Sequence, residues 1–360
     1  WASRVPLTKL KILVVIWQIL TVFPSISSVD FPPLYSHFLS RIDFVNFDVG
    51  AIVSASCILP GVSFYHRLLL TTLGPLALAL VLVLTFQMAK RRSGIGSTGV
   101  TARRMAWSRH MAAGLLLTFL VFTSTSTIVF KTFACDEEAV EGESYLRADY
   151  SVSCDSTLHM WFMVYAGIMI VVYPVGIPLL YAYILWKNRD ALNPRLQTDA
   201  NAGEHHDATS GSTLNFLPKS DYLTKESLEE LNQKLEKRMR NPNLVPSMFL
   251  WKDFGASMYY FEVVDCGRRI LLTGVLIFIQ PNTPEQAAVA CIFAFASLLG
   301  FELLRPHLDP MDSWIYRLGC VVIFLSNFLA LLIKVDSAEG QQTFLGGILV
   351  AVNVLLFLAI

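Results

Sequence analysis

The sequence predicts an all-α membrane protein, a polytopic bundle of about eight transmembrane helices with one larger cytosolic loop that contains a helix. Two observations support this class. Of the 360 residues, 54% are hydrophobic and only 16% are charged, whereas soluble domains carry roughly 25% charged residues. Long apolar stretches also recur along the whole chain, and a helix needs about 20 such residues to cross the hydrocarbon core.

Eight apolar stretches have approximately the required length, and each is continuous rather than alternating, which favours helices over barrel strands. They are Leu10–Ser28, Phe64–Ala89, Met105–Phe130, Met160–Trp186, Phe254–Gln280, Gln286–Leu304, Trp314–Val335 and Phe344–Ile360. The first is the weakest because Gln18 and Pro24 interrupt it. We expect residues 1–360 to form a single membrane domain, and to be a fragment of a longer chain because the sequence starts at Trp1 without a methionine.

The distribution of charge predicts the orientation of these helices. The segment from Lys90 to Arg109 carries six basic residues and no acidic one, whereas Thr132 to Thr157 carries seven acidic residues and one basic residue. Basic loops stay in the cytosol, so the first segment should be cytosolic and the acidic loop 132–157 extracellular. Alternation then places both ends of the chain in the cytosol, and we expect an integral protein of the plasma membrane.

The acidic loop contains Cys135 and Cys154, and a disulfide between them would hold the loop as a compact cap. Cys57 also lies in a segment expected outside and is an alternative partner, since sequence does not fix connectivity. Cys266, Cys291 and Cys320 fall within apolar stretches and are expected to be small packing residues.

The loop 187–251 is expected to have two parts. Residues 197–215 are rich in small and polar residues, which indicates disorder. Residues 224–240 are expected to form a helix, in which Leu228, Leu231 and Leu235 share one face. A surface helix that packs on the membrane domain is favoured, and a short coiled-coil contact between subunits is left open.

Four charges stand at the entrance of the fifth apolar stretch, in the sequence YYFEVVDCGRRILLTG. They are Glu262, Asp265, Arg268 and Arg269. On a helix, Asp265 can pair with Arg268 three residues on and with Arg269 four residues on. The favoured interpretation is an ion cluster in the headgroup region that orients the helix. Paired charges that face the bundle interior are the other option for their position. The functional alternatives are a coupling element that transmits loop movement to the following spans, and a direct role in an ion pathway.

Other polar residues and prolines lie inside the predicted spans, and each has a structural and a functional interpretation. They are Thr123, Thr125, Asn327, Asn353, Pro174 and Pro178. Hydroxyl and amide side chains in membrane helices usually support close packing and bridge helices, although a water-lined path is an alternative. The two prolines each remove a backbone donor, so a kink is expected in the fourth span.

The sequence gives no sign of an enzyme, a cofactor site or a metal centre, because no phosphate-binding glycine loop, Cys-x-x-Cys pair or paired nucleophile occurs. The formal net charge is zero, so binding of nucleic acid is not expected. The expected partner is therefore the lipid bilayer, and a homo-oligomer is left open.

Four stretches together resemble the C-terminal membrane domain of large surface proteins of algae, oomycetes and related protists, a domain similar to transient receptor potential channels. They are KLKILVVIWQILTVFPS, FVNFDVGAIVSASCILP, YLRADYSVSCDS and YYFEVVDCGRRILLTGVLIF. The resemblance implies a channel-like or sensory module behind an extracellular region in a preceding part of the chain. Cys57, Cys135 and Cys154 match the outside cysteines of that family, and Glu262 to Arg269 match its charged stretch.

Function is therefore expected to be that of a channel-like domain, with cations as the permeant ions because an acidic outer loop concentrates them. The resemblance does not extend to a pore loop, since the outside connections 280–285 and 336–342 are too short for a selectivity filter. A non-conducting anchor or receptor module is the alternative, and a transporter is the third candidate.

Overall fold

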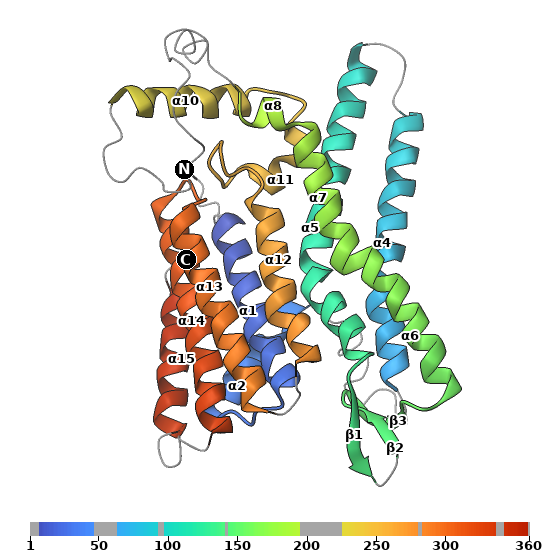
Figure 1. Cartoon of the computed structure of the whole chain (residues 1–360). Coiled ribbons are helices and arrows are strands. Elements are labelled where there is room, and N and C mark those ends of the chain that lie inside the picture. Colours follow the sequence, from blue (N-terminus) through green and yellow to red (C-terminus); the bar gives the residue numbers. More distant parts are fainter. Residues whose placement is uncertain are drawn as a thin grey trace, which may run out of the picture.

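The computed structural model describes residues 7–46, 63–92, 97–140, 143–194, 225–279, 283–335 and 342–358. Cys57 and the segment 197–215 lie outside these ranges. The described chain is a helical bundle (Figure 1). The all-α class that the composition predicts is therefore correct for most of the chain, with one small sheet added.

Six helical segments are long and apolar enough to cross a membrane within the described ranges. They are α1 (Leu7–Ser27), α4 (Phe64–Arg92), α5 (Ser97–Lys131), α6 (Thr157–Ile170) with its continuation α7 (Gly176–Lys187), α13 (Pro284–Leu304) and α14 (Pro310–Lys334). Two further apolar helices are shorter: α12 (Phe261–Thr273), followed by the 3₁₀ turn η5 (Val275–Phe278), and α15 (Gln342–Leu358). Each corresponds to one of the eight predicted stretches.

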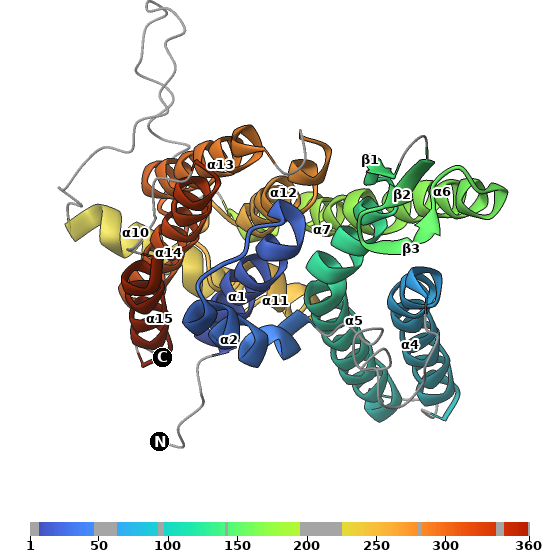
Figure 2. The same cartoon turned by 90° about the horizontal axis from the view of Figure 1, so that it is seen from below.

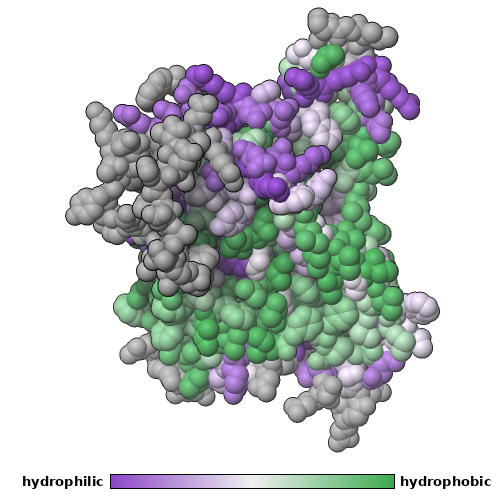
Figure 3. Space-filling model, turned by 45° about the horizontal axis from the view of Figure 1, so that its top comes forward, coloured by the Kyte–Doolittle hydropathy of each residue, from purple (hydrophilic) through white to green (hydrophobic). Residues whose placement is uncertain are grey.

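The surface of the molecule suits a bilayer. Figure 3 shows a band of hydrophobic residues around the middle of one face, with hydrophilic residues above and below it. The basic end of α4 and the start of α5 lie at one end of the bundle, and the acidic loop lies at the other (Figure 1). This arrangement fits an integral membrane protein whose two loops face opposite compartments.

The helices pack around two hydrophobic cores. One surrounds α1 and is built with α12, α13, α14 and α15, and the other lies among α4, α5, α6 and α7. Helix α4 joins the second core only near its outer end, since its buried residues all fall between Phe64 and Pro75. Figure 2 shows α4 beside α5 at the edge of the bundle, away from α1.

Gln18 and Pro24 do not interrupt the first helix, because each is accommodated locally. The Gln18 amide nitrogen donates to the backbone oxygens of Val45 and Leu120, each at 2.9 Å. Pro24 lies in the last turns of α1, close to Ser27 where the helix ends. α1 is in fact among the most buried of the long apolar helices.

The predicted start of the fifth span at Phe254 is wrong, because α12 begins only at Phe261. The segment before it pairs with the connection between α13 and α14. Phe254 forms a β-bridge with His307, and the Gly255 N–H donates to the backbone oxygen of Pro306 at 2.9 Å. This pairing satisfies backbone groups that a helix would otherwise satisfy.

The end of the bundle that carries the acidic loop contains structure that the apolar pattern did not predict. After α1 the chain forms α2 (Pro33–Ile42) and the 3₁₀ turn η1 (Asp43–Asn46). The acidic loop folds into an antiparallel sheet of β1 (Cys135–Val140), β2 (Glu143–Leu146) and β3 (Asp149–Ser153), in that order. It brings the sulfur atoms of Cys135 and Cys154 within bonding distance of each other.

The opposite end of the bundle carries α8 (Arg189–Leu192), α10 (Lys225–Met239), the 3₁₀ turn η4 (Val245–Ser247) and α11 (Met248–Trp251). Helix α10 lies across this end, roughly perpendicular to the bundle (Figure 1). Its buried Arg238 donates to the Phe254 backbone oxygen at 2.8 Å and stacks on the Trp251 ring. The predicted helix therefore packs on the membrane domain.

Candidate functional site

The four charges at the start of α12 lie inside the bundle. Glu262 and Arg269 are each 1% exposed, Asp265 is 5% exposed and Arg268 is 8% exposed. The charges therefore face the bundle interior, which is the second of the two positions that the sequence left open. Burial of this kind occurs only where charges are paired and hydrogen-bonded.

Asp265 is the centre of the cluster. Its Oδ1 accepts from Arg268 Nε at 2.9 Å, and its Oδ2 accepts from Arg269 Nη2 at 2.7 Å. These are the two pairs that the helical spacing predicts. The Tyr316 hydroxyl of α14 also donates to Asp265 Oδ1 at 2.8 Å, so one carboxylate joins both arginines to a second helix.

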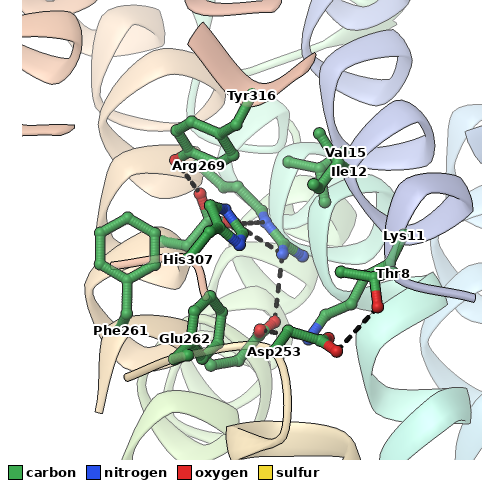
Figure 4. Close-up of a pocket in the computed structure, with 12 residues that line it drawn as sticks. Thr8, Lys11, Ile12, Val15, Asp253, Phe261, Glu262, Arg269, His307 and Tyr316 are labelled. Atoms are coloured by element: carbon green, nitrogen blue, oxygen red, sulfur yellow. Dashed lines mark hydrogen bonds and ion pairs between the residues drawn. The ribbon is translucent and has the colours of Figure 1, made fainter. Parts of the chain in front are cut away.

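A fifth charge, Lys11, comes from α1 and was not anticipated from the sequence. Its Nζ lies 2.5 Å from Glu262 Oε2 and donates to the Phe249 backbone oxygen at 3.2 Å. Glu262 Oε1 in turn accepts from Arg269 Nη2 at 3.3 Å. Figure 4 shows Lys11 and Thr8 reaching the cluster from α1. The sequence does contain one signal for the involvement of Lys11, because a lysine is unusual near the start of a strongly apolar stretch.

The ion-paired cluster contains three basic and two acidic side chains, and Asp253, which borders it, adds a third acidic group. Within the described chain, Arg268 Nη2 and Arg269 Nη1 are buried and have no hydrogen-bond partner. A cavity of about 20 Å³ lies against Lys11, Asp265 and Arg269, which is large enough for one water molecule. The site thus combines arginine N–H groups that have no partner in the described chain with space for a small polar guest.

His307 borders the same cavity from the connection between α13 and α14. Its ring packs against the rings of Phe254, Phe301 and Tyr316. Burial lowers the pKa of His307 from 6.5 to about 4, although nearby Asp253 acts in the opposite direction. The imidazole is therefore neutral at pH 7 and adds no charge to the cluster.

Helix α1 carries a line of polar residues that continues from the cluster toward the outside. This line, the polar seam, consists of Thr8, Lys11, Gln18, Thr21 and Ser25. Spacings of three, four and seven residues keep all five on one helical face. Each has a partner on a neighbouring element: Asp253 for Thr8, Glu262 for Lys11, Leu120 for Gln18, Asn46 for Thr21 and Lys131 for Ser25.

The polar seam ends at Thr21 and Ser25, where it opens into a cavity of about 480 Å³ between α1, α2, α4 and α5. This space is the outer cavity. Thr21 and Ser25 line it from α1, and Ser124 and Thr127 line it from α5. Its charged lining residues are Asp43, Arg67, Lys131 and Arg147. The run of hydroxyl residues in the third predicted span thus partly faces this polar cavity.

Phe119 of α5 lies against the charge cluster. Its ring lies 5.5 Å from Lys11 Nζ and 4.7 Å from the Arg269 guanidinium carbon. The next residue along α5 is Leu120, whose backbone oxygen accepts from Gln18 of the polar seam. Phe119 therefore packs on the cluster next to the point where α5 bonds to the polar seam, and the buried Val15 of α1 lines the cavity of the cluster.

The remaining polar residues singled out in the sequence lie elsewhere. Thr125 donates to the Thr71 backbone oxygen at 3.3 Å, and the buried Thr123 hydroxyl has no partner within the described chain. Asn327 donates to Ala290 of α13, whereas Asn353 bonds within its own helix. Asn327 thus bridges two helices, as packing amides do.

The two prolines of the fourth span lie at and beside an irregularity in that helix. Pro174 lies inside a π-helical turn, η2 (Val171–Val175), and Pro178 lies in the first turn of α7. Such turns often mark functional positions in helices. Tyr173 of η2 also donates to the Thr72 backbone oxygen of α4 at 2.5 Å, so the turn is tied to a neighbouring helix.

Comparison with protein-family models, with characterised proteins and with solved structures gives no match for this chain. Function is accordingly argued from the buried cluster and the polar seam.

Proposed function

We propose that this chain is a channel-like domain of the plasma membrane that moves small ions along the polar seam between α1 and α5. The acidic loop 132–157 faces the outside and both ends of the chain face the cytosol. The observation that carries the proposal is the cluster of Lys11 with the four charges of α12, buried inside a bundle of apolar helices. Ionisable residues inside membrane segments are costly and usually mark ion pathways.

A purely structural role fits this cluster less well. Replacing a buried ion pair by hydrophobic residues of similar volume is often neutral or stabilising, so stability alone gives little reason to keep five buried charges. The arginine N–H groups without partners and the adjoining cavity add to this, since they leave room for a polar guest beside Lys11 and Arg269. The polar seam then leads from that position toward the outer cavity.

In this conformation we propose that Phe119 closes the route. Its ring lies against Lys11 and Arg269 on one side, and Gln18 begins the outer polar segment on the other. A hydrophobic constriction between two polar regions can gate conduction by excluding water. Movement of α1 relative to α5 would open it, and the position of α1 is linked to the cytosolic segment through Thr8 and Asp253.

We propose a charge for the permeant ion that differs from the one the sequence predicts. The acidic loop favours cations, but three of the four charged residues lining the outer cavity are basic. Since a charged cleft concentrates ions of the opposite sign, we propose that anions are preferred. A reversal potential under a salt gradient measures this preference.

The test is ion flux into liposomes that contain the purified protein, with Phe119→Ala compared with Phe122→Ala. Both phenylalanines are buried on α5, but Phe119 belongs to the core around α1 and Phe122 to the core around α4. Both substitutions should lower stability by about 3–5 kcal/mol. Only Phe119→Ala should increase flux, because only that ring lies on the proposed route.

Equal flux through the two folded variants would overturn the proposed route. If neither variant nor the unmodified protein passes ions in either direction of the gradient, the non-conducting anchor becomes the better description. Both substitutions remove the same core volume. Leakage through a loosened bundle would therefore raise the ion flux of both variants together.

A further inference from the structure

A second large cavity lies far from the polar seam, among the helices of the other core. It has a volume of about 500 Å³ and lies between α4, α5 and the π-helical turn η2 with the start of α7. Its lining is almost wholly apolar, with Leu76 and Val83 from α4 and Leu115 and Ile177 from the facing helices. The cytosolic half of α4 has no buried residue, and the cavity lies between this half and α5, which α4 also contacts directly through Phe86.

The cavity has a length that matches one leaflet of a bilayer. Along α5 its lining runs from Trp107 through Met111 and Gly114 to Thr118, residues that share one helical face. At 1.5 Å per residue this line is roughly 16 Å long, and half of the hydrocarbon core is about 15 Å thick. A single acyl chain is the natural occupant of an apolar space with these dimensions.

A basic and polar cavity adjoins the apolar one at Trp107, at the cytosolic end of α5. This second space, of about 420 Å³, is lined by Arg104, Ser108 and Arg109 of α5 and by residues 242–246. Trp107 lines both cavities, and its ring lies 5.5 Å from that of Phe86 on α4. Tryptophan is typical of the membrane–water interface, so the junction lies where a headgroup meets its chains.

Charge identifies the class of headgroup. Both arginines are exposed, and within the described chain no acidic side chain pairs with Arg104 or Arg109. The whole segment from Lys90 to Arg109 contains no acidic residue. Guanidinium groups favour phosphate oxygens because they can donate in pairs.

We propose that the two cavities together bind one anionic phospholipid from the adjacent leaflet. Its phosphate lies against Arg104 and Arg109, its glycerol region lies at Trp107, and one acyl chain fills the cavity between α4 and α5. The site does not depend on ion translocation. It gives α4, whose cytosolic half has no buried residue, a lipid as an additional packing partner.

Gly114 allows a specific test of the acyl-chain position. A Cβ atom at Gly114 would meet no atom within 4 Å, so Gly114→Phe places a ring in the cavity without a clash against the backbone. Gly300 of α13 has the same open surroundings and does not line the cavity, which makes Gly300→Phe the matched control. The readout is crosslinking of a photoactivatable phosphatidylserine to α5, in bilayers of phosphatidylcholine, located by peptide mapping.

We expect Gly114→Phe to abolish crosslinking to α5 and Gly300→Phe to leave it unchanged. Arg104→Gln and Arg109→Gln should each raise the half-saturating amount of phosphatidylserine by about five-fold, since one basic residue contributes about 1 kcal/mol near an anionic surface. Arg317→Gln on α14, whose arginine pairs with Glu302, is the charge control and should have no effect. Melting temperatures of all variants, measured in parallel, show whether each protein is folded.

Three results would overturn the proposal. Equal crosslinking of phosphatidylserine and phosphatidylcholine probes would show that the basic cavity does not select the headgroup. Crosslinking of a folded Gly114→Phe protein at the unmodified level would show that the chain lies elsewhere. Competition by soluble glycerophosphoserine at low concentration would indicate a site for free phosphates, and would count against a lipid as well.

Discussion

Arg269 shows most clearly how single residues set the properties of this bundle. Its guanidinium binds Asp265 and Glu262, stacks over Phe119, and keeps one buried N–H group without a partner. Removing one member of such a buried group leaves an uncompensated charge, at a cost of about 3–5 kcal/mol. A single substitution in the cluster must therefore be compared with the double substitution that also removes its partner, before either is interpreted as a change in function.

His307 should make the stability of the protein depend on pH. Burial lowers the pKa of His307 from 6.5 to about 4, so the folded state disfavours the charged imidazole. Its contribution to stability is complete above pH 6.5 and is lost as the pH falls toward 4. We expect the free energy of unfolding in detergent to fall by about 2 kcal/mol over this window.

The variant His307→Phe should remove this part of the pH dependence, because phenylalanine keeps the ring contacts with Phe254, Phe301 and Tyr316 and does not titrate. Thermal melts of both proteins from neutral to mildly acidic pH measure the difference. Parallel pH profiles for the two proteins would show that His307 is not the titrating group.

Among the helical elements, the π-helical turn η2 depends on Gly176. A Cβ atom added there would lie 2.8 Å from the Val171 backbone oxygen, which is closer than a carbon and an oxygen can approach. Gly176→Ala should therefore lower the melting temperature, because the turn must distort to relieve the contact. Circular dichroism during heating measures this change.

The matched control for the π-helical turn is Gly167→Ala, earlier in the same continuous helix, where a Cβ atom would meet nothing within 4 Å. Helix propensity alone should make this change neutral or stabilising by up to about 1 kcal/mol. If both glycine variants behave alike, the tight approach to Val171 has no energetic importance.

The sheet of the acidic loop is closed by the pair Cys135 and Cys154, whose sulfur atoms the structure brings together. We expect both thiols to resist alkylation until a reductant is added, and Cys135→Ser with Cys154→Ser to lower stability by about 2–5 kcal/mol. Mass spectrometry of the alkylated protein measures the first effect. Because His159 lies beside them, free alkylation accompanied by release of a bound metal ion would show a metal site in place of the disulfide.

At the scale of elements, sequence periodicity located the long helices because continuous apolar runs have few other solutions in a membrane. Sequence periodicity did not predict the segments whose structure depends on hydrogen bonds between polar backbone groups. The sheet between Cys135 and Ser153 lies in a loop with no apolar alternation, and the late start of α12 depends on the pairing of Phe254 with His307. These backbone pairings join segments that the sequence does not place together.

The candidate site was predictable only in part. Helical spacing within one segment gave the pairs of Asp265 with Arg268 and Arg269, because both partners lie on the same helix. Lys11 comes from a helix more than two hundred residues away in the chain, and no local pattern links it to Glu262. For the same reason, the outer cavity and the cavity beside α4 were not anticipated, since each is formed by several helices.

Considered as a whole, the molecule has a basic end and an acidic end, and this polarity predicts its orientation. A cysteine introduced at Met105, near the basic end, should be protected from a membrane-impermeant maleimide in intact cells. A cysteine at Thr157, at the start of α6 beside the acidic loop, should react. The unmodified protein gives the background from its own cysteines. Labelling of both introduced cysteines from the same side would contradict the orientation.

The buried cluster in its membrane setting is tested most directly by removing the pair Lys11 and Glu262 together. Glu262→Gln alone should destabilise the protein by about 3–5 kcal/mol, because Lys11 loses its partner. Lys11→Met with Glu262→Gln leaves the net charge of the cluster unchanged and should recover most of that stability. Measured in the Phe119→Ala background, ion flux through this double variant should still fall about tenfold, equivalent to about 1.4 kcal/mol. A stable double variant with undiminished flux would contradict a role of these charges in ion movement.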